Sequence, residues 1–380
     1  MESPRPEAVR GVTEDAIRVG TYGPLTGPAA AWGVMLRSLQ AYLAHINESG
    51  GVHGRKIELL IEDDQYDPAK TETAVKKLVD SDQVFAVLGG VGSTNGRRVS
   101  DFLEERGIPF VTPASGDVFF TEPPRKNTYT VYPRYRTEGQ LIGEYIGREL
   151  RSLKVGVLHQ EDDFGRQGAD GITRGLRRFG RDIHMRASCL PTDTDLSPQV
   201  AAIIEQMPEV LVIFTAPRQA ILAVQALEAK KRRPHILTSF VLSDESILRE
   251  GGALWEGTVT SAVTKLAYAD DPSVAHFREV LKKQAPDLPS SAFAVAGFQI
   301  AMPFVEALER AGRELTPEKL YAAFETLRDW EGGGPHWTGG GLGPPVTFGP
   351  GDHLGVDKLY FAKAEKGQWV KVSDWIELSR

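Results

Sequence analysis

A glycine-rich turn leads into three polar residues that could bind an anion. Ser93, Thr94 and Asn95 follow the sequence LGGVG, where a helix of about ten residues is predicted to begin. The first backbone amides of a helix have no acceptor within the helix, and they point toward the space in front of it. With the Ser93 hydroxyl, these amides would suit a carboxylate.

A second polar segment is predicted to lie beside this turn. Val84–Leu88 and Ile108–Thr112 are continuous apolar runs bounded by glycines, as is typical of buried parallel strands. The helix between them makes a βαβ unit, and ligands of such sheets bind outside the carboxyl ends of the strands. We therefore expect Ala114, Ser115 and Gly116 to lie at the same edge as the first turn.

The glycine pattern does not match the common nucleotide motifs. Gly90-Val91-Gly92 begins like a dinucleotide fingerprint, but Asn95 replaces the third glycine, and the turn is not the first of the chain. The sequence also lacks the Gly-x-x-x-x-Gly-Lys-Ser/Thr phosphate loop and the Gly-x-Ser-x-Gly turn of many hydrolases. A nicotinamide-dependent enzyme is therefore disfavoured, and we expect no cofactor.

Metal and disulfide chemistry find little support. The histidines are scattered, and none pairs with another at a helical ligand spacing. Glu62-Asp63-Asp64 and Glu161-Asp162-Asp163 each follow a predicted strand and could hold a cation, but solvated loops are the favoured interpretation because no third ligand follows at a suitable spacing. The lone Cys189 excludes an intramolecular disulfide.

Three aromatic residues stand outside any periodic apolar face. Trp32 lies in a turn rich in glycine and proline, Phe164 lies in a polar loop after a strand, and Phe240 ends a strand. Each could pack against its own domain. All three nevertheless fall near strand carboxyl ends, where small-ligand pockets with apolar walls form.

Strands and helices alternate along most of the chain, which predicts two doubly wound α/β arrays. The first array starts with Ala16–Tyr22, whose alternation we interpret as a sheet edge. The second begins at Lys154, and residues 264–311 offer only helices. The last part reads as a β-hairpin that turns at 365–367.

Composition and length limit the class of protein. With 380 residues, the chain exceeds one ordinary core, so two domains are expected. A net charge of −7 gives no basic footprint for nucleic acid. The polar start of the sequence has no secretory apolar core, so either the protein is cytosolic or a removed export signal preceded this sequence.

Four stretches together resemble one known family. They are GPLTGPAAAWG, INESGGVHGRKIELLIEDDQYDPAKTETAVKKLV, AVLGGVGSTNGRRVSDFLEERGIPFVTPASG and VGVLHQEDDFGRQGADG. The chain resembles the type I periplasmic solute-binding proteins of ABC importers, the group of the leucine/isoleucine/valine-binding protein. The resemblance runs from Ile17 to about Val372.

The resemblance implies two lobes that close on a ligand around three hinge crossovers. Residues 1–132 and 264–343 would form the N-terminal lobe, and residues 136–261 and 348–380 the C-terminal lobe. The crossovers would lie near 132–136, 262–266 and 343–347.

The family's binding roles can be carried over residue by residue. Ser93 matches the serine that holds the ligand carboxylate, and Ala114 matches the backbone carbonyl that accepts from an ammonium. Trp32 matches the aromatic residue that covers the ligand side chain. Phe164 and Thr215, or Ala216 beside Thr215, match contacts from the second lobe.

Two departures concern the ammonium of an amino-acid ligand. Gly116 stands where amino-acid binders commonly have a threonine, and Phe240 stands where their acidic partner is expected. A buried ammonium without a carboxylate costs several kcal/mol, so we predict a ligand with a polar or carboxylate head and an apolar or aromatic body. Tyr66 and Gly92 replace the cysteine pair of some relatives.

The resemblance predicts an extracytoplasmic, non-enzymatic solute-binding component of an ABC importer. Its partners would be a small-molecule ligand, with branched-chain or other hydrophobic amino acids kept open, and a membrane-embedded ABC permease. We expect a monomer without metal, cofactor or nucleic acid. A ligand-sensing regulator or receptor domain of the same fold is the alternative.

Overall fold

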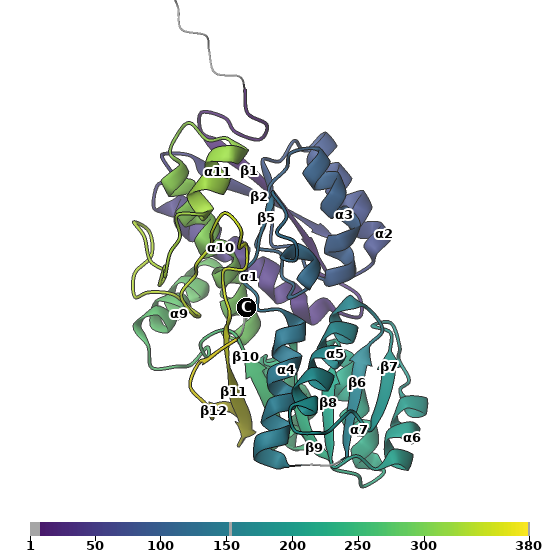
Figure 1. Ribbon diagram of the computed structural model, residues 1–380. Coiled ribbons are helices and arrows are strands. Elements are labelled where there is room, and N and C mark those ends of the chain that lie inside the picture. The colour runs from purple at the N-terminus through teal and green to yellow at the C-terminus, as the bar shows by residue number, and fades with distance from the viewer. Residues whose placement is uncertain (1–7, 152–153, 379–380) are drawn as a thin grey trace, which may run out of the picture.

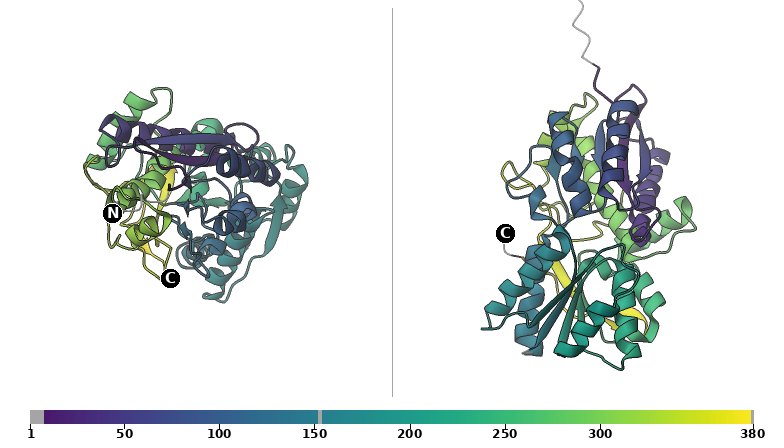
Figure 2. Two further views of the ribbon diagram at one scale, coloured as in Figure 1. Left: turned by 90° about the horizontal axis from the view of Figure 1, so that it is seen from above. Right: turned by 90° about the vertical axis from the view of Figure 1, so that its right-hand side faces the viewer.

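The computed structural model describes residues 8–151 and 154–378, which form two lobes stacked end to end (Figure 1). Each lobe is built on its own, mostly parallel β-sheet, and the predicted fold class is confirmed. The parallel strands of both sheets run toward the junction between the lobes, so their carboxyl ends face it (Figures 1 and 2).

The first lobe contains a parallel sheet with the order β2-β1-β3-β4-β5. Its strands are β1 Ala16–Gly23, β2 Lys56–Asp63, β3 Ala86–Leu88, β4 Phe110–Val111 and β5 Thr128–Tyr129. The interpretation of the first strand as a sheet edge was wrong, because β1 lies between β2 and β3. Its alternation reflects exposure at its start alone; from Val19 to Gly23 every residue is buried.

Helices from two distant parts of the chain cover this sheet. They are α1 Gly33–Glu48, α2 Pro68–Lys76, α3 Ser93–Glu105, α9 Pro272–Gln284, α10 Ala292–Ala311 and α11 Pro317–Phe324. At the start of α2, the Asp67 side chain caps the helix by accepting from the Ala69 amide, and Pro68 takes the first helical position. Helix α10 is long and apolar enough to cross a membrane, but 89% of its most apolar window is buried inside the protein.

The second lobe contains a sheet with the order β12-β11-β10-β9-β8-β6-β7. Its strands are β6 Val155–Gln160, β7 Met185–Cys189, β8 Val210–Phe214, β9 His235–Thr238, β10 Val259–Ala262, β11 Lys358–Glu365 and β12 Gln368–Lys371, with β13 Ile376–Glu377 paired to β11. Strands β11 and β12 form the predicted terminal hairpin, and β11 runs antiparallel to β10.

Helices lie on both sides of the second sheet (Figure 2). They are α4 Tyr135–Tyr145, α5 Asp163–Arg177, α6 Ser197–Gln206, α7 Pro217–Ala229 and α8 Glu245–Gly251. Helices α4 and α5 approach closely because glycines face each other: a Cβ at Gly139 would lie 2.2 Å from the Gly168 carbonyl oxygen. This packing fixes α5, whose first turn carries Phe164.

The chain crosses between the lobes three times. The first crossover joins β5 to α4, and the second leaves β10 toward α9. The third lies later than the predicted 343–347, because Leu354 still bridges to Thr130 and the Gly355 amide donates to the Thr130 carbonyl (2.7 Å) in the first lobe. The chain joins the second sheet at Lys358.

Candidate ligand-binding site

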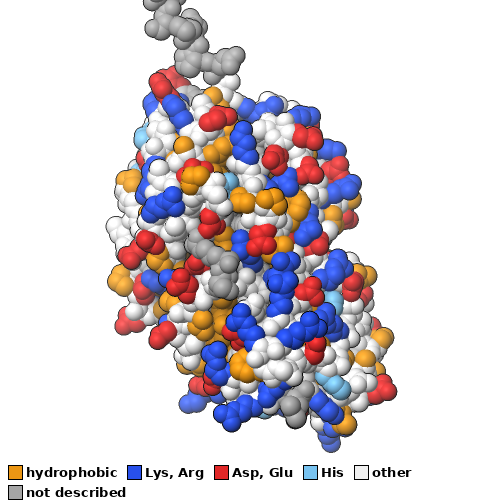
Figure 3. Space-filling model, in the orientation of Figure 1, with side chains coloured by type: hydrophobic (Ala, Val, Ile, Leu, Met, Phe, Trp, Pro, Cys, Tyr) orange, Lys and Arg blue, Asp and Glu red, His pale blue; other side chains and the backbone are white. Residues whose placement is uncertain are grey.

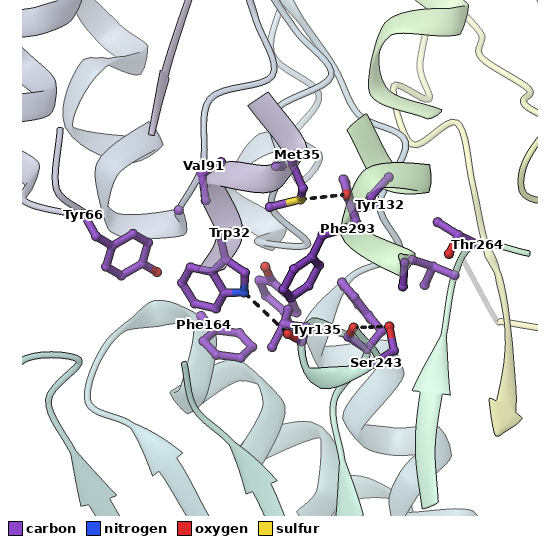
Figure 4. A pocket seen from close by; sticks show the side chains of 17 residues that line it. Trp32, Met35, Tyr66, Val91, Tyr132, Tyr135, Phe164, Ser243, Thr264 and Phe293 are labelled. Atoms are coloured by element: carbon purple, nitrogen blue, oxygen red, sulfur yellow. Dashed lines mark hydrogen bonds between the residues drawn. The ribbon is translucent and has the colours of Figure 1, made fainter. Parts of the chain in front are cut away.

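A cavity lies at the junction of the two lobes (Figure 4). It encloses about 570 Å³ of space between the side chains, counting the part that opens to solvent. The first lobe contributes Trp32, Met35, Tyr66, Val91, Gly92, Ala114, Ala292, Phe293 and Ala296; the second contributes Phe164, Phe240, Val241 and Ser243; the crossovers contribute Tyr132, Tyr135, Val263 and Thr264.

Trp32 is a main part of the cavity wall that the first lobe provides. A short 3₁₀ turn, Ala30–Trp32, brings the indole to the start of α1, where it is 5% exposed. Its ring lies 5.1 Å from that of Tyr66 (Figure 4). The indole nitrogen donates to the Val241 carbonyl (3.4 Å), so Trp32 also contacts the second lobe.

Aromatic rings from the second lobe and the first crossover form the opposite wall. The Phe240 ring stacks with Tyr132 and with Tyr135, each at 5.7 Å between ring centres. Phe164 meets the Tyr135 ring edge-on at 4.7 Å. Such tilted and stacked pairs are favourable beyond the area they bury, so this wall is held in shape before any ligand contacts it.

The cavity carries no ionised side chain among the described residues that line it. Burial, helped by the Asp162 carboxylate, raises the pKa of Tyr66 well above its usual value, so this phenol is a neutral donor. Burial also raises the pKa of Tyr132 and of Tyr135. The outer surface differs, because acidic and basic side chains are interspersed over the face shown in Figure 3.

The first turn of α3 borders the cavity at Gly92. Within the described residues, the amides of Ser93 and Thr94 donate no hydrogen bond, and the Thr94 hydroxyl is buried without a partner. The Ser93 hydroxyl pairs with that of Ser115 (2.8 Å). This helix start therefore offers unused donors beside an otherwise uncharged cavity.

A buried polar network holds this helix start and Tyr66 together. Asp64 is fully buried and accepts from the Thr71 hydroxyl (2.6 Å), the Asn95 amide (3.2 Å) and the Tyr66 backbone N–H (2.8 Å). The interpretation of this acidic stretch as a solvated loop was wrong for Asp64. Burial raises the pKa of Asp64, against these hydrogen bonds.

Polar contacts link the lobes on both flanks of the cavity. On one side Gln160 of the second lobe donates to the Tyr66 hydroxyl (3.3 Å). On the other, Gln167 of the second lobe donates to Asp117 (2.6 Å), which also accepts two bonds from Arg97 (2.5 and 2.7 Å). The lobes are therefore in direct contact across the site.

A model of the family described as periplasmic binding protein matches residues 16–368. The chain belongs to the periplasmic binding protein family. Proteins of this family act outside the cytoplasm, bind small molecules and work with ABC permeases; the relatives compared are solute-binding proteins, not enzymes. The predicted resemblance is confirmed.

Individual relatives of this periplasmic binding protein differ in what their names say they bind. The leucine-, isoleucine-, valine-, threonine- and alanine-binding protein of Pseudomonas aeruginosa is 27% identical over 81% of this chain and 82% of its own. Leu/Ile/Val-binding protein homolog 3 of Brucella melitensis is 26% identical over 78% of this chain and 79% of its own. The fatty acid ABC transporter substrate-binding protein of Thermomonospora curvata superposes with a TM-score of 0.85 at 25% identity, over 97% of this chain and 94% of that one.

The structure places the predicted ligand contacts in two groups. Trp32, Ala114, Phe164 and Phe240 line the cavity. The others, Ser93, Thr94, Ser115, Gly116 and Thr215, lie outside its lining.

Two of these outer residues have clear local surroundings. Gly116 backs onto the first crossover, where a Cβ would lie 2.3 Å from the Pro133 carbonyl oxygen, so the backbone excludes a threonine. Thr215 is fully buried, and its hydroxyl bonds to the Ala216 carbonyl (3.2 Å). For all nine residues, contact with a ligand stays a prediction.

Sequence reasoning missed several lining residues, above all Met35, Tyr132, Tyr135 and Phe293. The two tyrosines belong to the segment TYTVYPRYR, whose aromatic density at a predicted crossover was an available signal. Met35 and Phe293 stand at the starts of helices and look like core residues.

Proposed function

We propose that this periplasmic binding protein is the solute-binding component of an ABC importer and captures a small acid with an apolar or aromatic body. The observation that carries the proposal is the uncharged aromatic cavity between the lobes, bordered by the free donors at the start of α3. The apolar body would lie among Trp32, Phe164 and Phe240, with its carboxylate toward Ser93 and Thr94.

The lining argues against an α-ammonium group on the ligand. No described Asp or Glu lines the cavity, and Phe240 fills the place where the family resemblance suggests an acidic partner. A cation moved from water into this setting would keep its desolvation cost without a counter-charge. The names of two relatives point to different ligands, fatty acids in one and branched-chain amino acids in the other, and the lining of this cavity favours the first.

Ligand capture would act through the balance between open and closed lobes. A ligand that contacts both Trp32 and Phe240 binds the closed form better than the open form, and it shifts the balance by that difference. An ABC permease would then recognise the closed shape. In this proposal the polar end of the ligand site is shaped from the first lobe by Ala114, Ser115 and Gly116. From the second lobe, Thr215 supports the wall of the site.

Thermal unfolding in the presence of candidate ligands tests the proposal. Octanoate, benzoate, L-leucine and N-acetyl-L-leucine would be compared at equal concentration. A ligand at about 100 times its Kd adds about 2.7 kcal/mol to the free energy of unfolding. We expect octanoate or benzoate to raise the Tm and L-leucine to have little effect. The proposed ligand class is contradicted if L-leucine gives the largest rise and its N-acetyl form gives none.

A further inference from the structure

Glu138 is a buried carboxylate whose hydrogen-bond partners are all neutral. It stands in the first turn of α4, and its exposed fraction is 0%. Oε1 accepts from the Phe240 amide (2.7 Å) and the Ser261 hydroxyl (2.5 Å), and Oε2 accepts from the Ser239 hydroxyl (3.0 Å). Within the described part of the chain it forms no ion pair.

These partners join three elements at the cavity. Helix α4 follows the first crossover, and Ser261 stands near the end of β10, just before the second. Ser239 and Phe240 link β9 to the short 3₁₀ turn Phe240–Leu242. The single carboxylate therefore ties the backbone at Phe240 to the elements next to the first and second crossovers.

The backbone at Phe240 in turn determines two features of the cavity. Its ring stacks between Tyr132 and Tyr135, and the next residue, Val241, offers the carbonyl that Trp32 contacts. A shift of this backbone would move the apolar wall and the Trp32 contact together.

We propose that Glu138 is a positioning residue for ligand recognition: its carboxylate fixes the backbone at Phe240 and so sets how far the aromatic wall reaches into the cavity. The inference rests on the proposed function, because it takes the cavity to be the place where ligand binds. It adds a pH-dependent element that the lining residues themselves do not provide.

The protonation state of Glu138 makes the hold on the Phe240 backbone depend on pH. Burial raises the pKa of Glu138 to about 7, although the bonds from Ser261, Phe240 and Ser239 oppose that rise. The groups that face it from β9 and β10 are neutral serines, and on α4 the titratable neighbour is Tyr135, whose pKa this carboxylate helps to raise. Because a neutral acid accepts a weaker hydrogen bond than a carboxylate, the Phe240 amide is held less firmly at acid pH.

A fluorine label at position 240 tests the positioning without any ligand. In the full chain with 4-fluorophenylalanine at 240, we expect the fluorine NMR shift to titrate with a midpoint near 7. The titration should vanish in Glu138→Gln and persist in Glu144→Gln, a control on the same helix whose carboxylate pairs with Arg178 on the surface. Ser261→Ala, which keeps the charge and removes one donor, should raise the midpoint. A shift that does not titrate, or an unchanged titration in Glu138→Gln, overturns the proposal.

Calorimetric binding of octanoate tests the consequence for recognition. A charge-assisted hydrogen bond exceeds a neutral one by about 1 kcal/mol, so the Kd should rise about fivefold as the pH falls from about 8.5 to 5.5. Glu138→Gln should lose this dependence, and Glu144→Gln should keep it. Equal pH dependence in all three proteins contradicts the role of Glu138. Absence of binding by octanoate and the other test acids contradicts the proposed ligand class, and the fluorine titration then still decides on Glu138.

Discussion

The two walls of the cavity are held in place by different means. On the first lobe, Asp64 ties the start of α3 to Tyr66 through three hydrogen bonds, and the wall presents donors. On the second lobe, rings form the surface and the buried Glu138 lies behind them. The first lobe is therefore suited to a polar head and the second to an apolar body, although each wall depends on a buried carboxylate.

The largest expected effect is loss of the aromatic contact that both walls share. Trp32→Ala removes the indole that lies beside Tyr66 and reaches Val241. Burying an aromatic side chain contributes about 2–3 kcal/mol, so the Kd for octanoate should rise roughly 30- to 160-fold. Titration calorimetry measures it, with Trp32→Phe as the control that keeps most of the area. A change below about threefold would show that the ligand does not lie against this wall.

The next largest effect is expected on stability, when a hydrogen bond in the buried polar network of the first lobe is broken. Asp64→Asn keeps the shape but turns one acceptor into a donor that faces the Tyr66 amide or the Thr71 hydroxyl. An unsatisfied buried group costs about 1–3 kcal/mol, which urea unfolding would measure. Asp67→Ala is the matched comparison, since it removes only the cap of α2. Equal stability of Asp64→Asn and the native chain would mean that the network does not anchor this wall.

On the second lobe, the corresponding carboxylate should make stability depend on pH. The native pKa of Glu138 is raised to about 7 from 4.5, so the folded state holds the proton to a higher pH than the unfolded state. The stability advantage of the native chain over Glu138→Gln should therefore decline as the pH rises from about 5 to about 8. At about 1.4 kcal/mol for each pKa unit, this shift predicts a change of about 2–3 kcal/mol over that pH range. Thermal unfolding at both pH values measures it; an advantage that grows with pH would reverse the assignment.

The smallest expected effect distinguishes the polar head from the apolar body. Ser93→Ala removes one hydroxyl beside the amides of α3, and we expect octanoate binding to weaken by about 1 kcal/mol. Octanol, which has the same body without the carboxylate, should not discriminate between the two proteins. If both ligands lose affinity equally, Ser93 shapes the cavity and does not contact the head group.

The sequence predicted the frame of the fold well because its signals are local. Buried strands such as β8 are continuous apolar runs, and the hairpin turn at residues 365–367 has its own chemistry. The third crossover was misplaced, since residues 344–355 have no periodicity and their pairing with Thr130 is set by contacts far away in sequence.

The candidate site was predicted less completely. Trp32, Phe164 and Phe240 were identifiable because they break the apolar pattern around them. Tyr132 and Tyr135 belong to a crossover, and Glu138 follows in a helix that looks ordinary in the sequence. Their importance comes from long-range packing, in which Glu138 meets residues about a hundred positions away, and no local pattern encodes that.

A crystal structure of the protein with the acid that gives the largest thermal shift would show directly how the ligand lies between the lobes. We predict the carboxylate within hydrogen-bond distance of the Ser93 or Thr94 amide and the apolar body between Trp32 and Phe240. An acid bound with its carboxylate toward the second lobe, or outside the space between the lobes, would contradict the binding of the head group at the start of α3.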